Sequence, residues 1–249
     1  GILFNKDKTE LKRYPAGRSE TTYTIPDSVT SIEDSAFYEC TSLSSIEIPD
    51  SVTKIGSFAF YGCTNLSSIE IPDSVTSIGE DAFYGCTSLS SINIPDNVTH
   101  IEGSTFCKCT SLSSINIPDS VTHIEDAAFC ECTSLSSIEI PDSVTKIGAA
   151  AFSETQLIEN QDGIEYVGKW AVSGDRDMTS VEIREGTIGI ADYAFSGDKN
   201  LSNINLPEGL MYIGDTAFNG CENLTNISIP DSVTAIGSYA FSTTKVIEN

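Results

Sequence analysis

The chain has 249 residues, 39% of them hydrophobic, which is enough to bury a core. Its 36 Asp and Glu residues outnumber its 13 Lys and Arg residues, and the net charge of −23 argues against nucleic acid or an anionic membrane surface as a partner. No stretch approaches the ~18 consecutive apolar residues of a membrane-spanning helix, so we expect no membrane insertion, and the first ten residues lack the basic-then-apolar order of a signal peptide.

The first segment, residues 1–24, is predicted to form a β-hairpin-like cap. Residues 1–11 align with the residues from Gly163 onward, where strand-forming aromatic and β-branched residues flank a glycine. That composition is typical of a β-hairpin. We therefore expect two hairpins, one at the start of the chain and one inserted later.

From residue 25 the sequence repeats. Nine units begin with Ile-Pro-Asp-Ser-Val or a variant of it, at Ile25, Ile48, Ile71, Ile94, Ile117, Ile140, Ile183, Leu206 and Ile229. All intervals are 23 residues except the 43 residues from Ile140 to Ile183. We therefore divide the chain into six units over 25–160, a β-hairpin insertion over 161–182 and three units over 183–249.

Each unit is predicted to form one coil of a solenoid. Its apolar positions follow neither a 3.6-residue nor a 2-residue period throughout, so the unit must turn corners. The segment from Leu43 to Ile48 matches the strand of a leucine-rich repeat, and Pro49 ends it. The return side, Val52 to Phe60, is left open as an irregular segment or a short helical turn.

Stacking of the coils would bury the apolar side chains that a single coil cannot cover. At a spacing of about 4.8 Å, each apolar position becomes a continuous column and nine strands form a parallel sheet roughly 40 Å long. The predicted aromatic column contains Phe37, Phe60, Phe83, Phe106, Phe129, Phe152, Phe195, Phe218 and Phe241. Residues 242–249 resemble 153–160, which precede the inserted hairpin, so we expect a longer array in which blocks of repeats alternate with hairpins.

The repeat unit, IPDSVTSIEDSAFYECTSLSSIE, resembles the BspA-like leucine-rich repeats over nearly the whole chain. Pro-Asp-Ser-Val, Ala-Phe and Cys-Thr-Ser-Leu recur at fixed offsets, and the hairpin GIEYVGKWAVSG is similar to insertions found in that family. The resemblance implies a cell-surface or secreted protein that adheres to host or microbial proteins, with no catalytic residue and no cofactor. The departures are Thr187 in place of Val or Leu, and Asp198 in place of Cys.

Five of the eight cysteines follow the repeat, at Cys40, Cys63, Cys86, Cys109 and Cys132, and Cys221 has the same phase. We interpret them as a structural column of half-buried thiols with few if any disulfides. Cys107 and Cys130 complete two C-x-C pairs on adjacent coils, which leaves a four-thiolate zinc site as a minority alternative. The pattern predicts no metal.

Two further columns have a structural and a functional interpretation. His100 and His123 stack one coil apart beside Glu102 and Glu125, so they are either exposed variation or a pH-sensitive or metal-binding patch. A column of aspartates follows each proline and is explained by turn chemistry, with weak calcium binding as the alternative. Its members are Asp27, Asp50, Asp73, Asp96, Asp119, Asp142 and Asp231.

The residues flanking each strand isoleucine should face solvent and form an acidic, hydrogen-bonding sheet surface. We expect a protein partner to dock there or on the hairpin, with the chain a monomer. The candidate residues are Ser45, Glu47, Ser68, Glu70, Asn93, Asn116, Glu139 and Glu182, with Tyr166 and Trp170 on the hairpin. Alternatives are a carbohydrate-binding module that uses Tyr166 and Trp170, and a structural spacer; an enzyme is disfavoured because no acid, base or phosphate loop is assembled. Trp170 can instead simply pack the hairpin onto a coil.

Overall fold

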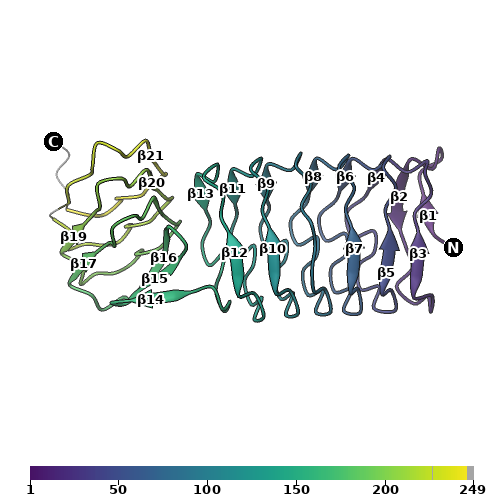
Figure 1. Cartoon of the computed structure of the whole chain (residues 1–249), viewed down its shortest axis with the longest axis horizontal. Helices are drawn as coiled ribbons and strands as arrows, with labels where there is room; N and C mark the ends of the chain where they lie inside the picture. Colours follow the sequence, from purple (N-terminus) through teal and green to yellow (C-terminus); the bar gives the residue numbers. More distant parts are fainter. Residues whose placement is uncertain (226, 246–249) are drawn as a thin grey trace. The chain divides into compact units, whose positions relative to one another are not determined.

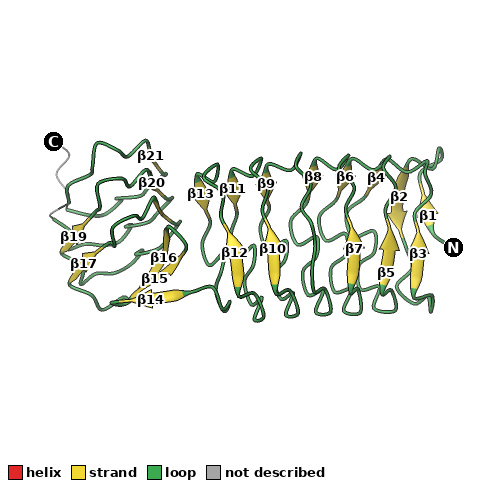
Figure 2. Cartoon of the chain, in the orientation of Figure 1, coloured by secondary structure: helices red, strands yellow, loops and turns green. Residues whose placement is uncertain are grey.

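The structure is a computed structural model that describes residues 1–225 and 227–245 (Figure 1). Residue 226 and residues 246–249, within the predicted last block of repeats, lie outside this description. The described residues form short β-strands joined by turns and loops, and none of them is helical (Figure 2). None of them forms a helix that could span a membrane. The predicted fold class, a leucine-rich-repeat solenoid of stacked coils, is confirmed.

The chain divides into two compact units. The first contains residues 1–144 and 151–157, and the second contains residues 145–150 and 158–249. Figure 1 shows the coils of the first unit standing side by side in sequence order. Both units are built from the same two ladders of strands.

The first ladder is built from the strand predicted at the Leu-x-x-Ile segment of each repeat. In each of these strands the isoleucine points inward and its two neighbours point outward. Residues 23 apart pair in parallel register, as Ser45 does with Ser68 and Glu47 with Glu70. The ladder consists of separate segments in place of one nine-stranded sheet. Its strands are β3 (Thr22–Thr24), β5 (Ser45–Glu47), β7 (Ser68–Glu70), β10 (Ser114–Asn116) and β12 (Ser137–Glu139) in the first unit, and β17 (Ser180–Glu182) and β19 (Asn203–Asn205) in the second.

The return side, which the sequence left open, begins with a second parallel ladder of two-residue strands. In each strand of the first unit an inward Ile follows a polar residue, as in Ser31 and Ile32. These strands are β4 (Ser31–Ile32), β6 (Lys54–Ile55), β8 (Ser77–Ile78), β9 (His100–Ile101) and β11 (His123–Ile124) in the first unit. In the second unit they are β13 (Lys146–Ile147), β18 (Gly189–Ile190), β20 (Tyr212–Ile213) and β21 (Ala235–Ile236).

A run of tight turns follows each of these short strands. The N–H groups of Ser35 and Phe37 donate to carbonyls of the next coil at 2.8 and 2.7 Å, whereas that of Ala36 donates within its own coil at 3.1 Å. Ser35 needs a positive φ of 57°, and the residue two before Phe has a positive φ in every coil. N–H groups that bond to the next coil therefore alternate with N–H groups that bond within the coil. The turns of adjacent coils are hydrogen-bonded to each other in this way, as adjacent strands would be.

Both predicted hairpins are present. β1 (Leu3–Phe4) pairs antiparallel with β2 (Glu10–Arg13), while β14 (Glu159–Gln161), β15 (Ile164–Val167) and β16 (Trp170–Gly174) form an antiparallel meander. β2 then pairs in parallel with β4, and β16 with β18. The last strand of each hairpin therefore occupies a place in the second ladder.

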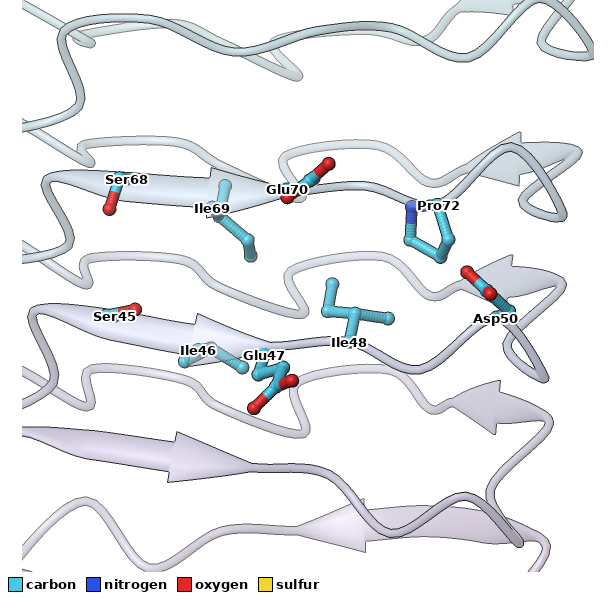
Figure 3. Close-up of a pocket in the computed structure, with 9 residues that line it drawn as sticks. All are labelled: Ser45, Ile46, Glu47, Ile48, Asp50, Ser68, Ile69, Glu70 and Pro72. Atoms are coloured by element: carbon cyan, nitrogen blue, oxygen red, sulfur yellow. The ribbon is translucent and has the colours of Figure 1, made fainter.

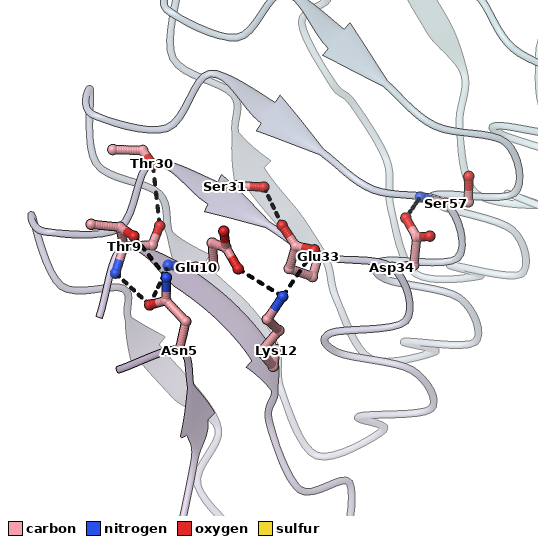
Figure 4. Close-up of polar contacts among 9 residues, drawn as sticks. All are labelled: Asn5, Thr9, Glu10, Lys12, Thr30, Ser31, Glu33, Asp34 and Ser57. Carbon is pink, nitrogen blue, oxygen red and sulfur yellow. Dashed lines mark hydrogen bonds and ion pairs between the residues drawn. The ribbon is translucent and has the colours of Figure 1, made fainter. Parts of the chain in front are cut away.

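Polar contacts join the first hairpin to the first coil (Figure 4). The Asn5 side-chain oxygen accepts hydrogen bonds from the N–H groups of Thr9 and Glu10 at 2.9 and 3.1 Å, which closes the hairpin turn. The Lys12 ammonium lies 2.7 Å from Glu10 and 3.4 Å from Glu33. These contacts fix the start of the second ladder.

The core is the predicted phenylalanine column. Successive rings from Phe37 to Phe152 stack with centroids 5.1–5.6 Å apart, and Phe195, Phe218 and Phe241 stack at 5.3 Å in the second unit. Phe83 has no exposed surface. The column is confirmed as core.

Candidate interaction surface

The outward residues of the first ladder form the candidate surface. Paired strands place equivalent side chains directly beside one another, as for Glu47 and Glu70. The exposed candidates are Glu47, Ser68, Glu70, Asn93, Asn116, Glu139 and Glu182, and Ser45 is half-buried. The predicted outward orientation of this row is therefore present in both units.

A groove of about 630 Å³ lies over strands β5 and β7 in the first unit. Figure 3 shows Ser45 and Glu47 of β5 beside Ser68 and Glu70 of β7. In each strand the isoleucine, Ile46 or Ile69, lies between the serine and the glutamate. The groove is lined by Ser45, Ile46, Glu47, Ile48, Asp50, Ser68, Ile69, Glu70 and Pro72. The groove combines a nearly buried apolar floor with polar and acidic edges, so it offers a partner mainly hydrogen-bonding and charged groups.

The groove carries uncompensated negative charge. Glu47, Asp50 and Glu70 line it, and none of its lining residues is cationic. The only hydrogen bond described for these three carboxylates is from the Thr24 hydroxyl to Glu47, at 2.9 Å. Like charges directly opposite in neighbouring strands repel, so a positively charged group between them would be stabilised.

The hairpin aromatics are not on the surface. Trp170 and Tyr166 are each only 1% exposed. The indole lies over Gly189, where a Cβ would sit 2.3 Å from its ring, and stacks on Tyr212 at 5.9 Å. Trp170 therefore packs the hairpin onto a coil, as the alternative interpretation predicts, and neither Tyr166 nor Trp170 is exposed to a partner.

The unit that begins Ile183-Arg-Glu-Gly-Thr also lacks the proline of the other units, and the structure explains why. Arg184, where most units have proline, places its guanidinium 4.1 Å from the centre of the Tyr166 ring, and its backbone N–H donates to the Tyr166 hydroxyl at 3.2 Å. The same guanidinium bonds Glu159 at 3.0 Å. Arginine therefore ties the hairpin to the coil that follows it.

The two departures noted in the repeat, Thr187 and Asp198, change local packing in the second unit. Thr187 is buried with no partner for its hydroxyl in the described part of the chain. Asp198 accepts hydrogen bonds from the N–H groups of Asn200 and Leu201 at 3.0 and 3.2 Å, and burial raises the pKa of its carboxyl. Asp198 thus caps a turn where other coils mostly place a thiol.

The repeat places tyrosines in one column on three coils of the first unit, and the structure shows that they form an aromatic ladder on its turn side. The half-buried rings of Tyr38, Tyr61 and Tyr84 stack at 4.9 and 4.7 Å, with Arg13 over the first ring and Lys108 over the last. Their 23-residue spacing was the available signal. Because each ring face covers the next, the ladder offers edges and hydroxyls and not the open faces that stack on sugars.

The cysteine column is structural, as predicted, but more deeply buried than expected. The thiols of Cys63 and Cys132 donate to phenylalanine carbonyls at 3.1 and 3.0 Å, and burial raises the pKa of each to about 12. Cys109 does the same at 3.2 Å, so it does not converge with Cys107 and Cys130. The described residues contain no group of three or more Cys, His, Asp or Glu placed to hold a metal.

The histidines stack as predicted, with ring centroids 4.5 Å apart. Each Nδ1 lies within hydrogen-bond distance of the preceding threonine hydroxyl, Thr99 or Thr122, at 2.9 and 2.8 Å. Each threonine contact fixes the orientation of its imidazole. The aspartates of the exposed column do not form a group placed to hold a metal in the described part of the chain, so the calcium alternative gains no support.

Comparison with known proteins places these features in a family. Residues 16–136 and 122–248 match the BspA type leucine rich repeat region, in six copies. A search of curated protein sequences finds no match.

Solved structures give the same picture. The chain is 27% identical to a leucine rich cell surface protein from Faecalibacterium prausnitzii, with a TM-score of 0.51 and coverage of 97% of this chain and 83% of the other. It is 26% identical to a leucine-rich repeat protein from Bacteroides ovatus, with a TM-score of 0.53 and coverage of 97% and 82%.

Proposed function

Because the chain belongs to the BspA-type leucine-rich-repeat family, we propose that it is a binding scaffold, displayed at the cell surface or secreted, whose first-unit sheet docks a protein partner. Family members are generally non-enzymatic repeat scaffolds, and the Faecalibacterium relative is a cell surface protein. The observation that carries the proposal is the groove over β5 and β7. The partner is a host or microbial protein that adheres to this surface.

The chemistry of the groove defines the partner surface. Its apolar floor, Ile46, Ile48 and Ile69, is 3–8% exposed, so a partner gains little from hydrophobic contact alone. Its acidic edges favour a partner that brings Lys or Arg, because a guanidinium can bond two neighbouring carboxylates at once. We therefore propose a basic patch or an extended basic segment as the contacting element.

The alternatives have less support. A carbohydrate-binding module would need a platform of open aromatic faces, but Trp170 is buried, the Tyr61 ring is covered by its neighbours, and the exposed Tyr193 and Tyr239 lie two coils apart. A structural spacer would need no groove. We keep the spacer as the interpretation that a negative binding result would favour.

A matched pair of variants tests the proposal. Immobilised wild-type chain is probed with a panel of purified extracellular-matrix and microbial surface proteins, and any binder is then measured against Glu47→Gln/Glu70→Gln and Glu139→Gln/Glu182→Gln. Both double variants remove the same charge from the same row, but only the first alters the groove. We expect the groove variant to lose binding and the control to keep it.

Three results would count against the proposal. Equal loss in both variants would mean that the partner senses only the overall charge of −23. Equal retention would place the contact elsewhere on the chain. No binding by the wild type to any protein of the panel would favour the spacer.

A further inference from the structure

The tyrosine ladder changes chemistry at its end. The column that runs through Tyr38, Tyr61 and Tyr84 continues one coil at a time through Cys107, Cys130 and Ser153. Two neighbouring coils therefore place thiols where the three before them place phenol rings. This pair is separate from the buried cysteine column and from the proposed partner groove.

The backbone holds the two thiols in register. The N–H of Gly85 donates to the Cys107 carbonyl and the N–H of Lys108 donates to the Cys130 carbonyl, each at 2.8 Å. The N–H groups of Cys107 and Cys130 bond within their own turns at 3.0 Å, to Ser104 and Ala127. The two side chains thus stand in parallel, one coil apart.

The thiols of Cys107 and Cys130 occupy adjacent, in-register positions, and none of the described hydrogen bonds joins either thiol to a core carbonyl. By contrast, the thiols of Cys109 and Cys132, two residues further along, donate to phenylalanine carbonyls at 3.2 and 3.0 Å. Only one thiol pair on these coils is therefore available to a ligand that bridges two sulfurs.

Access and charge differ along the pair. Cys107 is 5% exposed, whereas Cys130 is half-buried and opens to solvent. The Lys108 ammonium lies 3.6 Å from Glu131 and its positive charge favours the Cys130 thiolate, but the Glu131 and Glu154 carboxylates oppose this and each has the larger effect on the Cys130 pKa. Burial is the largest effect, and it raises the pKa of Cys107 to about 12 and also raises that of Cys130, so a ligand must displace both protons.

We propose that Cys107 and Cys130 form a two-thiolate site for a soft monovalent metal ion, Cu(I). Thiolates select soft ions, and Cu(I) accepts two sulfur ligands where zinc needs four. On binding, both S–H bonds break, two S–Cu bonds form, two protons pass to solvent and the copper stays Cu(I). Lys108 offsets part of the negative charge of the resulting complex, against the opposing charges of Glu131 and Glu154.

The spacing favours this chemistry over a disulfide. In-register neighbours keep their Cβ atoms about one strand spacing apart, ~4.8 Å. A disulfide needs a Cβ separation of about 3.5–4.5 Å, so the coils would have to move together to form it. An ion placed between the sulfurs requires no such movement.

The test is an anaerobic Cu(I) titration of the full chain in competition with a chromophoric Cu(I) chelator. The variants are Cys107→Tyr and Cys130→Tyr, which restore the residue that three other coils carry, and the control is Cys132→Ala on the same coil. We expect one Cu(I) per chain in the wild type and in the control, and binding weaker by about 100-fold or more in either Tyr variant. Thermal unfolding of each variant checks that it is folded.

Two further readouts use the wild type alone. Cu(I) should protect Cys107 and Cys130, and not the other six cysteines, from alkylation followed by peptide mass spectrometry. The affinity should rise with pH by about tenfold per unit for each thiol that loses a proton. Unchanged binding in Cys130→Tyr, loss of binding in Cys132→Ala, or a Cys107–Cys130 disulfide as the product would overturn the proposal.

Discussion

Replacing Phe83 by Ala probes the column on which the stack depends. The ring has no exposed surface and lies between Phe60 at 5.1 Å and Phe106 at 5.6 Å. Truncating a buried Phe costs about 3–5 kcal/mol, and each lost stacking contact adds about 0.5–1.5 kcal/mol within that cost. We therefore expect Phe83→Ala to lower the free energy of unfolding of the first unit by about 4 kcal/mol.

Urea unfolding followed by far-UV circular dichroism measures this change. Phe241→Ala is the matched control, because that ring is half-buried and stacks on Phe218 alone among the described rings, so its loss should cost about 2 kcal/mol. Trp170, the one tryptophan, reports on the second unit by fluorescence. If Phe83→Ala lowers the free energy of unfolding by less than about 1 kcal/mol, with an unchanged dependence of that free energy on urea concentration (m value), the buried column is refuted.

Three further changes test other parts of the structure. Gly189→Ala would place a Cβ 2.3 Å from the Trp170 ring, so it should cost about 1–3 kcal/mol in urea unfolding, and no loss would contradict the indole position. Glu131, with φ of 57°, occupies the position of Gly62, so Glu131→Gly should raise stability by about 1 kcal/mol while Glu131→Ala does not; equal effects would remove backbone strain as the cause. Burial raises the pKa of Asp192 from 3.8 to about 6, so the fold binds the proton more tightly than the unfolded chain and loses this stabilisation as pH rises through that window. Asp192→Asn should therefore raise the melting temperature relative to wild type above pH 6 and not below pH 4, and a difference independent of pH would disprove the shift.

The stacked coils could be predicted because identical residues 23 apart have only one efficient way to be buried. Phe83 and its equivalents cannot be covered within a single coil, so the sequence period determines the column. The second ladder could not be predicted in the same way. A strand as short as Ser31–Ile32 contains one inward residue and leaves no alternation to detect.

The exposure of single residues was harder still. Trp is a residue type common in binding hot spots, so the sequence alone suggests that Trp170 is exposed. Its burial depends on the residue against which the indole packs. Gly189 stands where other coils carry Ser, Lys, His, Tyr or Ala, and the missing side chain provides the space for the indole. That signal lies 19 residues away from the tryptophan and acquires meaning only once strand β16 is known to lie beside β18.

The hydrogen bonds between coils of the first unit join each coil to its immediate neighbours, as those of Ser35 and Phe37 illustrate. A pulling force along the stack therefore meets each interface in turn and not all of them together. Releasing one coil frees 23 residues, which extend to about 80 Å, in exchange for a stacked rise of only ~4.8 Å. Under tension the first unit would lengthen in steps of one coil, so that a molecule attached at both ends could absorb a sudden load without detaching.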